Sequence, residues 1–123
     1  MSEFRDPALR VTLLPRDTNK HGSIFGGIIL SHIDLAASVE ARKTSGSKNI
    51  VTVAMDKVAF HKPVFVGDVV SFYTRTREIG RTSVAIEVQV EATRSDGGET
   101  VRVTEAEVVF VAVDSDWNPV PVQ

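Results

Sequence analysis

The chain has 123 residues, of which 42% are hydrophobic and 24% are charged, with a formal net charge of -2 and no cysteine. This size and composition predict one soluble globular domain over residues 1–123. They exclude disulfides and a thiolate nucleophile, argue against a nucleic-acid partner, and leave no apolar run of about 18 residues for a membrane-spanning helix.

The first residues and the histidines add two expectations. The opening six residues contain no apolar run of the kind found in signal peptides, so we expect a cytoplasmic protein. His21, His32 and His61 do not have the spacing of metal ligands, and we therefore expect no metal site.

The first third of the chain predicts a short strand, a polar loop and a long helix. Residues 10–14 favour a strand, which Pro15 ends because proline has no N–H for a sheet ladder. The helical pattern runs from about Phe25 to about Lys43 and is apolar on most sides. Asp34 is the one charged residue in its first fifteen positions. Because an unpaired buried charge costs several kcal/mol, we expect Asp34 to serve chemistry or a specific partner.

The second half of the chain predicts strands only. Residues 51–60 begin with alternating apolar side chains, and residues 69–77 have Val70, Phe72, Thr74 and Thr76 on one face. Residues 83–93 alternate most clearly, with Val84, Ile86, Val88, Val90 and Ala92 on one face. Residues 95–98 should turn the chain into a last strand from about Thr100 to Val113, apolar on both faces at its end.

One apolar helix and an antiparallel sheet predict an α+β domain in which the helix lies across one face of a strongly curved sheet. Such a helix has more apolar surface than one small sheet can cover. We therefore expect the chain to form an oligomer.

The loop and the helix start carry a motif that resembles a known family. Its residues are Pro15, Asp17, Thr18, Asn19, Gly22, Phe25, Gly26 and Gly27, with Asp34 seven residues further on. The motif is similar to the opening of the hotdog-fold acyl-CoA thioesterases, in particular the bacterial short-chain acyl-CoA hydrolase group. Further segments match in order and spacing from about residue 10 to about residue 119: 51–55, 62–68, 80–83 and 104–114.

The resemblance implies a hotdog fold, in which about five to six antiparallel strands wrap one long central helix. It implies hydrolysis of acyl-CoA to coenzyme A and a carboxylic acid, with no cofactor because coenzyme A is part of the substrate. It also implies a homodimer as the catalytic unit, commonly assembled into a hexameric trimer of dimers. In this family the site combines a loop asparagine of one subunit with a helix carboxylate of the other.

The residues themselves are consistent with this chemistry. Thioester hydrolysis needs an activated water or a carboxylate nucleophile, and donors for the developing oxyanion. Gly26 and Gly27 offer backbone N–H groups at the positive end of the helix dipole, although they are also typical close-packing glycines. Asp34 lies about two turns further along, on the order of ten ångströms away, so one carbonyl cannot reach both. We therefore expect Asp34 to act with the helix start of a second subunit.

Roles follow as hypotheses. Asp34 is a general base or a nucleophile that forms a mixed anhydride, and the sequence does not separate the two routes. Asn19 positions water or the thioester, although asparagine is also a typical turn residue. The motif positions suggest a set of contacts to the nucleotide end of coenzyme A: Arg81, Thr82, Ser83, Lys62 and Lys57.

Two other functions remain open. A hotdog hydratase or dehydratase would need a histidine beside the carboxylate, and His21 is the candidate, so an exposed His21 would count against it. His32 is about 200° from Asp34 around the helix, cannot form a dyad with it, and is interpreted as an interface or surface residue. The other function is an acyl-CoA binding protein without turnover, which an assay of free thiol release distinguishes.

Overall fold

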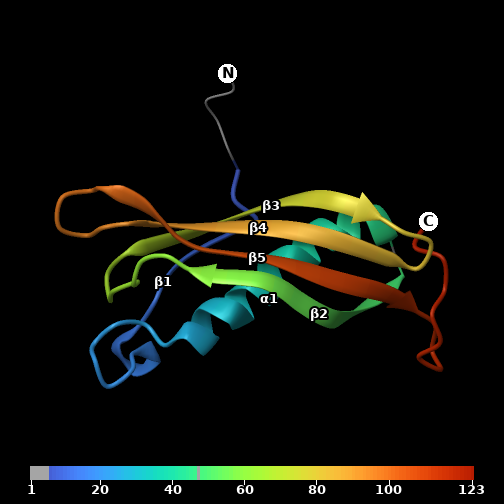
Figure 1. Ribbon diagram of the computed structural model, residues 1–123, viewed down its shortest axis with the longest axis horizontal. Helices are drawn as coiled ribbons and strands as arrows, with labels where there is room; N and C mark the ends of the chain where they lie inside the picture. Colours follow the sequence, from blue (N-terminus) through green and yellow to red (C-terminus); the bar gives the residue numbers. More distant parts are fainter. Residues whose placement is uncertain (1–5, 47) are drawn as a thin grey trace.

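The computed structural model describes residues 6–46 and 48–123, and the opening residues, where we expect no signal peptide, lie partly outside this range. Within these residues, one long helix and five strands make up the fold (Figure 1). In chain order the elements are β1 (Leu9–Thr12), a 3-10 turn (Pro15–Asp17), α1 (Gly26–Ser45), β2 (Asn49–Phe60), β3 (Val69–Ile79), β4 (Ser83–Thr93) and β5 (Thr100–Val113).

The five strands form one antiparallel sheet in the order β1-β3-β4-β5-β2, and α1 lies across one face of it (Figure 1). The predicted α+β fold with one long helix and a curved sheet is therefore confirmed. The edges of the sheet are β1, which pairs only with β3 over four residues, and the longer β2, which pairs with β5. No helix in residues 6–46 and 48–123 has the length and apolar character needed to cross a membrane.

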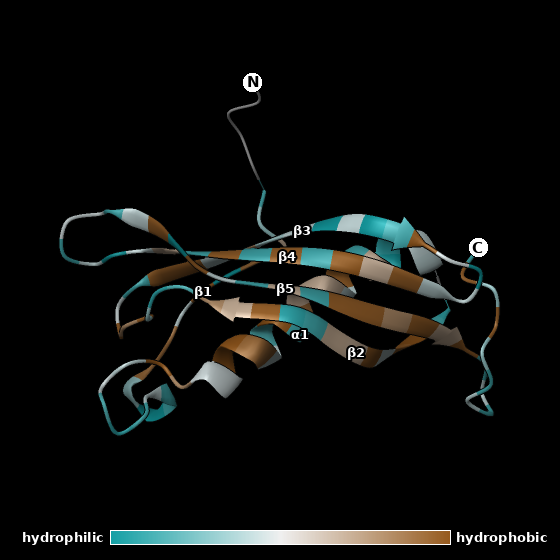
Figure 2. Cartoon of the chain, in the orientation of Figure 1, coloured by the Kyte–Doolittle hydropathy of each residue, from teal (hydrophilic) through white to brown (hydrophobic). Residues whose placement is uncertain are grey.

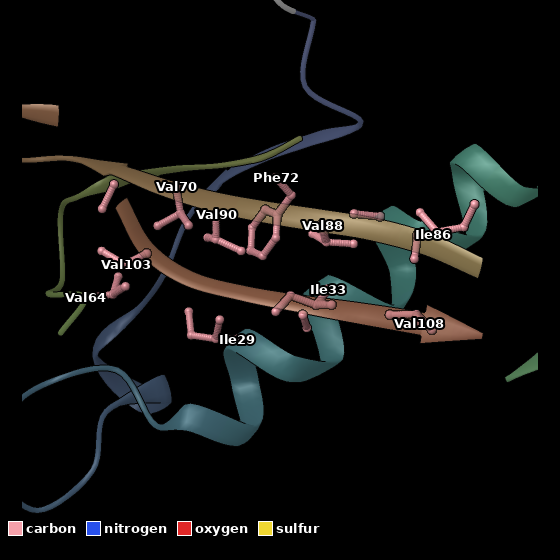
Figure 3. Packing of buried hydrophobic residues seen from close by; sticks show 14 of the residues in the cluster. Ile29, Ile33, Val64, Val70, Phe72, Ile86, Val88, Val90, Val103 and Val108 are labelled. Carbon is pink, nitrogen blue, oxygen red and sulfur yellow. The ribbon is translucent and has the colours of Figure 1, made fainter. Parts of the chain in front are cut away.

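The core lies between α1 and the inner face of the sheet. The helix contributes a stripe of buried residues at spacings of three and four: Ile29, Ile33, Ala36, Ala37 and Ala41. Alanines on this stripe leave room for the helix to lie close to the strands. The predicted inner face of β4 is fully buried, and Val70 and Phe72 of β3 join it (Figure 3). Figure 2 shows the resulting alternation of apolar and polar bands along the central strands.

The single chain leaves part of the apolar surface of α1 uncovered. In the single chain, α1 buries one stripe rather than most of its circumference, and Leu35 and Val39 are 59% and 45% exposed on its open side. The helix also continues two residues past Lys43 to Ser45. Gly46 ends it with φ of +65°, and the N–H of Gly46 donates to the carbonyl of Arg42.

Strand β2 departs from simple alternation. Its register with β5 shifts between Thr52 and Ala54 and again between Asp56 and Ala59. Each bulge moves the following side chains to the other face, so Val53 does not share the environment of Val51 and is largely exposed. The bulges therefore curve the edge of the sheet beside α1.

The segment after β5 closes the end of the core opposite the helix start (Figure 1). Val120 N–H donates to the Ala112 carbonyl, and Val122 N–H donates to the Arg81 carbonyl. Val122 is buried as a result. The last residues of the chain are thus part of the folded domain.

Candidate active site

Asp34 lies on the open side of α1 beside the edge strand β2. Its Oδ1 accepts a hydrogen bond of 2.7 Å from the Thr52 hydroxyl. The side chain is half-buried rather than sealed in the core, which corrects the expectation of a fully buried carboxylate in this chain. The bond from Thr52 orients one carboxylate oxygen and leaves the other open to water or a ligand.

The start of α1 offers free backbone donors. Its N-cap residue, Phe25, has no side-chain acceptor for the first N–H groups, and Ile28 N–H turns back to the Phe25 carbonyl. Within the described part of the chain, the N–H groups of Gly26 and Gly27 have no acceptor. The Phe25 ring covers Gly27 and the Phe60 ring approaches Gly26, so both glycines are also closely packed. The interpretation of Gly26 and Gly27 as oxyanion donors is therefore compatible with their interpretation as close-packing glycines.

The loop before α1 is organised by Asn19. Its Oδ1 accepts from the N–H groups of His21 and Ser23 at 2.8 and 3.3 Å, and its Nδ2 donates to the Ser23 hydroxyl at 3.0 Å. These bonds are those of a turn residue. The loop is tied to the neighbouring segment because Ile24 N–H donates to the Val64 carbonyl at 2.7 Å. Asn19 thus fixes the approach to the helix start.

A cavity of about 330 Å³ opens beside the helix start. Its residues come from α1 and the loop before it, from the end of β2 with the segment after it, and from β5: Ile24, Gly26, Ile29, Phe60, His61, Lys62, Pro63, Val64 and Thr104. Figure 3 shows Ile29 on the first turns of the helix at the same end of the core as Val64 and Val103. The cavity is apolar in most of its lining, its polar residues include Lys62, and Gly26 forms part of its wall.

An ion pair holds the segment that forms one wall of this cavity. Arg94 Nη1 contacts Asp68 Oδ2 at 2.6 Å and also donates to the Pro63 carbonyl at 2.9 Å. Asp68 Oδ2 accepts from Phe65 N–H at 2.9 Å, and the Arg94 guanidinium lies 5.2 Å from the centre of the Phe65 ring. Arg94 was not predicted from the sequence as part of the site. Nothing in a single sequence pairs residues that lie on different hairpins.

The five residues expected at the nucleotide end do not meet in one chain. Lys62 follows β2 at the cavity, where its N–H donates to the Val103 carbonyl, whereas the Thr82 carbonyl accepts from Ala112 N–H at the other end of β5. The strand rise separates these ends by roughly 30 Å. Arg81 and Ser83 lie with Thr82 at the far end.

Lys57 is engaged elsewhere. It has φ of +56° at the second bulge of β2, and its Nζ lies 3.2 Å from Glu107 Oε1. Arg77 approaches the same carboxylate at 3.4 Å. Lys57 therefore takes part in an ion-pair cluster among the strands rather than lining the cavity.

The histidines separate from the carboxylate. His21 is exposed on the loop, which is the observation that counts against a dehydratase. His32 is half-buried, with its ring stacked on Phe72 at 5.8 Å and Nδ1 bonded to the Ile28 carbonyl, so it is not a fully exposed surface residue, and its place at an interface stays a prediction. Among the described residues, no group of three or more His, Asp or Glu side chains is arranged to hold a metal ion.

Comparison with known proteins identifies the family. The model of the thioesterase superfamily matches residues 21–101, which include the helix, every cavity-lining residue except Thr104 and most of the sheet. The chain belongs to the thioesterase superfamily. The prediction that it is a thioester hydrolase is thereby confirmed, as is the predicted resemblance to hotdog thioesterases.

Relatives of this thioesterase align over most of its length. It is 37% identical over 116 residues to the acyl-CoA thioester hydrolase YciA of Salmonella typhimurium, covering 92% of this chain and 86% of that protein. Cj0915 of Campylobacter jejuni, a hexameric hotdog-fold thioesterase, is 43% identical with a TM-score of 0.89, over 95% of this chain and 90% of that one. HI0827, a hexameric broad-specificity acyl-coenzyme A thioesterase, was crystallised as an aspartate-to-alanine variant. It is 35% identical with a TM-score of 0.90, over 98% and 88% of the two chains. The predicted hotdog fold is confirmed.

Proposed function

We propose that this thioesterase hydrolyses acyl-CoA thioesters at a site shared between two copies of the chain, with Asp34 from one copy and the helix start from the other. The observation that carries the proposal is the division of the machinery along α1. The free N–H donors and the cavity lie at Gly26, whereas the Thr52-oriented carboxylate of Asp34 lies about 12 Å further along the same helix axis.

The exposed edge of the sheet supports this pairing. Strand β2 has 12 residues and pairs on one side only, with Val53 and Phe60 exposed along it. A long, apolar edge strand is a template for a further strand, and proteins that leave one open use it for association. Leu35 and Val39 add exposed apolar area on the helix beside Asp34.

Two-fold symmetry explains how the halves of the site meet. In an antiparallel pair of β2 strands, a two-fold axis near the middle of the strand sets the Thr52 half of one copy beside the Phe60 half of the other. The Thr52 hydroxyl donates a hydrogen bond to Asp34, and the Phe60 ring lies against Gly26. The same contact repeats on the other side of the axis, so one dimer contains two sites.

The proposed hydrolysis proceeds in successive steps at this site. The thioester carbonyl oxygen accepts from the Gly26 and Gly27 N–H groups, which stabilise the negative charge that develops on it. Asp34 of the other copy removes a proton from water, whose oxygen bonds to the carbonyl carbon. The C–S bond breaks, and coenzyme A leaves as a thiolate that takes up a proton. In a mixed-anhydride route, Asp34 bonds to the carbonyl carbon itself before water attacks.

The remaining polar residues have supporting roles. Asn19 holds the loop beside the helix start and, across the interface, positions the water or the thioester. Lys62 contacts a phosphate of coenzyme A at the cavity. Arg81, Thr82, Ser83 and Lys57 lie away from this cavity in the same chain, so their contribution requires a neighbouring copy. The hexameric relatives support assembly of three such dimers.

Free thiol release from acyl-CoA substrates tests the proposal. Asp34→Asn removes the base and should lower kcat about 10²- to 10⁴-fold. Glu40→Gln is the matched control, because Glu40 is a carboxylate on the same helix that accepts hydrogen bonds from Thr74 and Thr76. The control should keep wild-type turnover. Binding without thiol release for every chain length would favour the non-catalytic acyl-CoA binding protein, and unchanged turnover in Asp34→Asn would remove Asp34 from the reaction.

A further inference from the structure

Thr104 is a polar residue in the lining of the otherwise largely apolar cavity. It is 1% exposed, pairs with Phe60 on β2 and Val90 on β4, and contributes to the cavity wall beneath Ile29. Thr104 lies on the same face of β5 as Ala106 and Val108, because every second residue of a strand points to the same side. Its side chain therefore faces α1 rather than the outer surface of the sheet.

In the described part of the chain no side-chain hydrogen bond joins the Thr104 hydroxyl to another residue, and its oxygen is not one of the sealed unpaired atoms, so it opens to the cavity. A threonine hydroxyl has one donor and two acceptor positions, and nearly all buried hydroxyls in folded proteins are bonded. Valine has nearly the same shape and would fill this position without placing a hydroxyl at the cavity. The hydroxyl therefore indicates a partner that enters the cavity.

We propose that Thr104 selects acyl-CoA substrates whose acyl chain carries a hydrogen-bonding oxygen, such as a hydroxyl group, over unsubstituted chains of the same length. The inference rests on the proposed function, because it takes the acyl chain as the occupant of the cavity.

The arrangement of the cavity gives the direction of the chain. Gly26 contributes the wall at the proposed oxyanion donors, and Thr104 contributes a wall on β5. A thioester carbonyl held at Gly26 therefore directs its acyl chain toward the strand. Ile29 and Val64 contact the apolar carbons, and the Thr104 hydroxyl meets the oxygen on the chain. A site that bonds a substrate hydroxyl discriminates strongly against the analogue that lacks it, since its own polar group is then left unpaired.

The experiment compares kcat/KM for butyryl-CoA, 3-hydroxybutyryl-CoA and 4-hydroxybutyryl-CoA. The wild type should prefer at least one hydroxylated substrate by about tenfold, the ratio that corresponds to about 1.4 kcal/mol. Thr104→Val should reduce this ratio to about one, mainly by losing activity toward the hydroxylated substrate. Thr104→Ser keeps the hydroxyl and should keep the preference.

The control is Thr93→Val, which removes a threonine hydroxyl that pairs with Thr100 beside the β4–β5 turn and does not line the cavity. It should leave all three ratios unchanged. Equal kcat/KM for the three substrates in the wild type overturns the inference, as does a preference that survives in Thr104→Val, which would mean that a bound water satisfies the hydroxyl. Absence of thiol release from all three substrates would instead be a failure of the proposed function.

Discussion

Removal of Arg94 should destabilise the protein strongly, because it leaves the Asp68 carboxylate buried without its charge partner. The side chains of Arg94 and Asp68 are only 15% and 3% exposed, and their contact is 2.6 Å. Phe65 N–H would remain as a donor to Asp68, but the Pro63 carbonyl would also lose its bond from Arg94. Breaking a buried pair from one side costs about 3–5 kcal/mol. For a domain of this size that lowers Tm by about 10–20 °C.

Thermal unfolding followed by circular dichroism, at one fixed protein concentration, measures this change in Arg94→Ala. Arg75→Ala is the matched control, because Arg75 pairs with Glu87 at the surface and its side chain is 76% exposed. The control should change the free energy of unfolding by less than about 1 kcal/mol. The double variant Asp68→Asn with Arg94→Ala leaves no charge buried. Its loss of stability should therefore be smaller than the sum of the losses in the two single variants. A loss below about 1 kcal/mol in Arg94→Ala, or full additivity, would refute the assignment.

Three further predictions concern the reaction and the helix. Asp34→Asn should reduce kcat while Tm stays within a few degrees of the wild type, since the carboxylate is half-buried and an asparagine can still accept the hydrogen bond from Thr52. A collapse of Tm would point to a structural role. Lys62→Ala should raise the KM for acyl-CoA about fivefold, or about 1 kcal/mol, and leave the KM for acyl-pantetheine unchanged. Lys43→Ala, at an exposed lysine, is the control. Equal effects on both substrates would rule out a phosphate contact. Gly46→Ala should cost about 1–3 kcal/mol in a denaturant titration, because its φ of +65° strains an L-residue, and a neutral result would contradict the backbone conformation.

The central strands were the most predictable part of the fold. From Val84 to Ala92 every second residue is apolar, and all of these side chains are buried on the helix side. A strict period of two leaves little freedom, because a shift of one residue would expose the whole set. The end of β2 was less predictable. Its two bulges depend on how the strand curves beside α1, and no local residue pattern marks them.

The candidate site also has residues that a local sequence pattern predicts and residues that it does not. Asp34, Gly26 and Gly27 were found because a charge in an apolar helix and glycines at a helix start are local signals. Arg94 and Thr104 were missed as site residues because their roles arise from contacts between distant segments. The apolar surface of α1 was predicted to exceed what one small sheet can cover, and Leu35 and Val39 are exposed in the single chain.

The most direct test of the shared site is subunit complementation. Asp34→Ala and Asn19→Ala are each expected to be weakly active, because each site of either homodimer lacks one component. In a mixed dimer, one of the two sites combines the intact Asn19 of the Asp34→Ala chain with the intact Asp34 of the Asn19→Ala chain, and the other site lacks both. Random mixing of equal amounts, by joint unfolding and refolding, should restore about a quarter of the wild-type activity. Activity no higher than the mean of the two parent variants would contradict a site built from two chains.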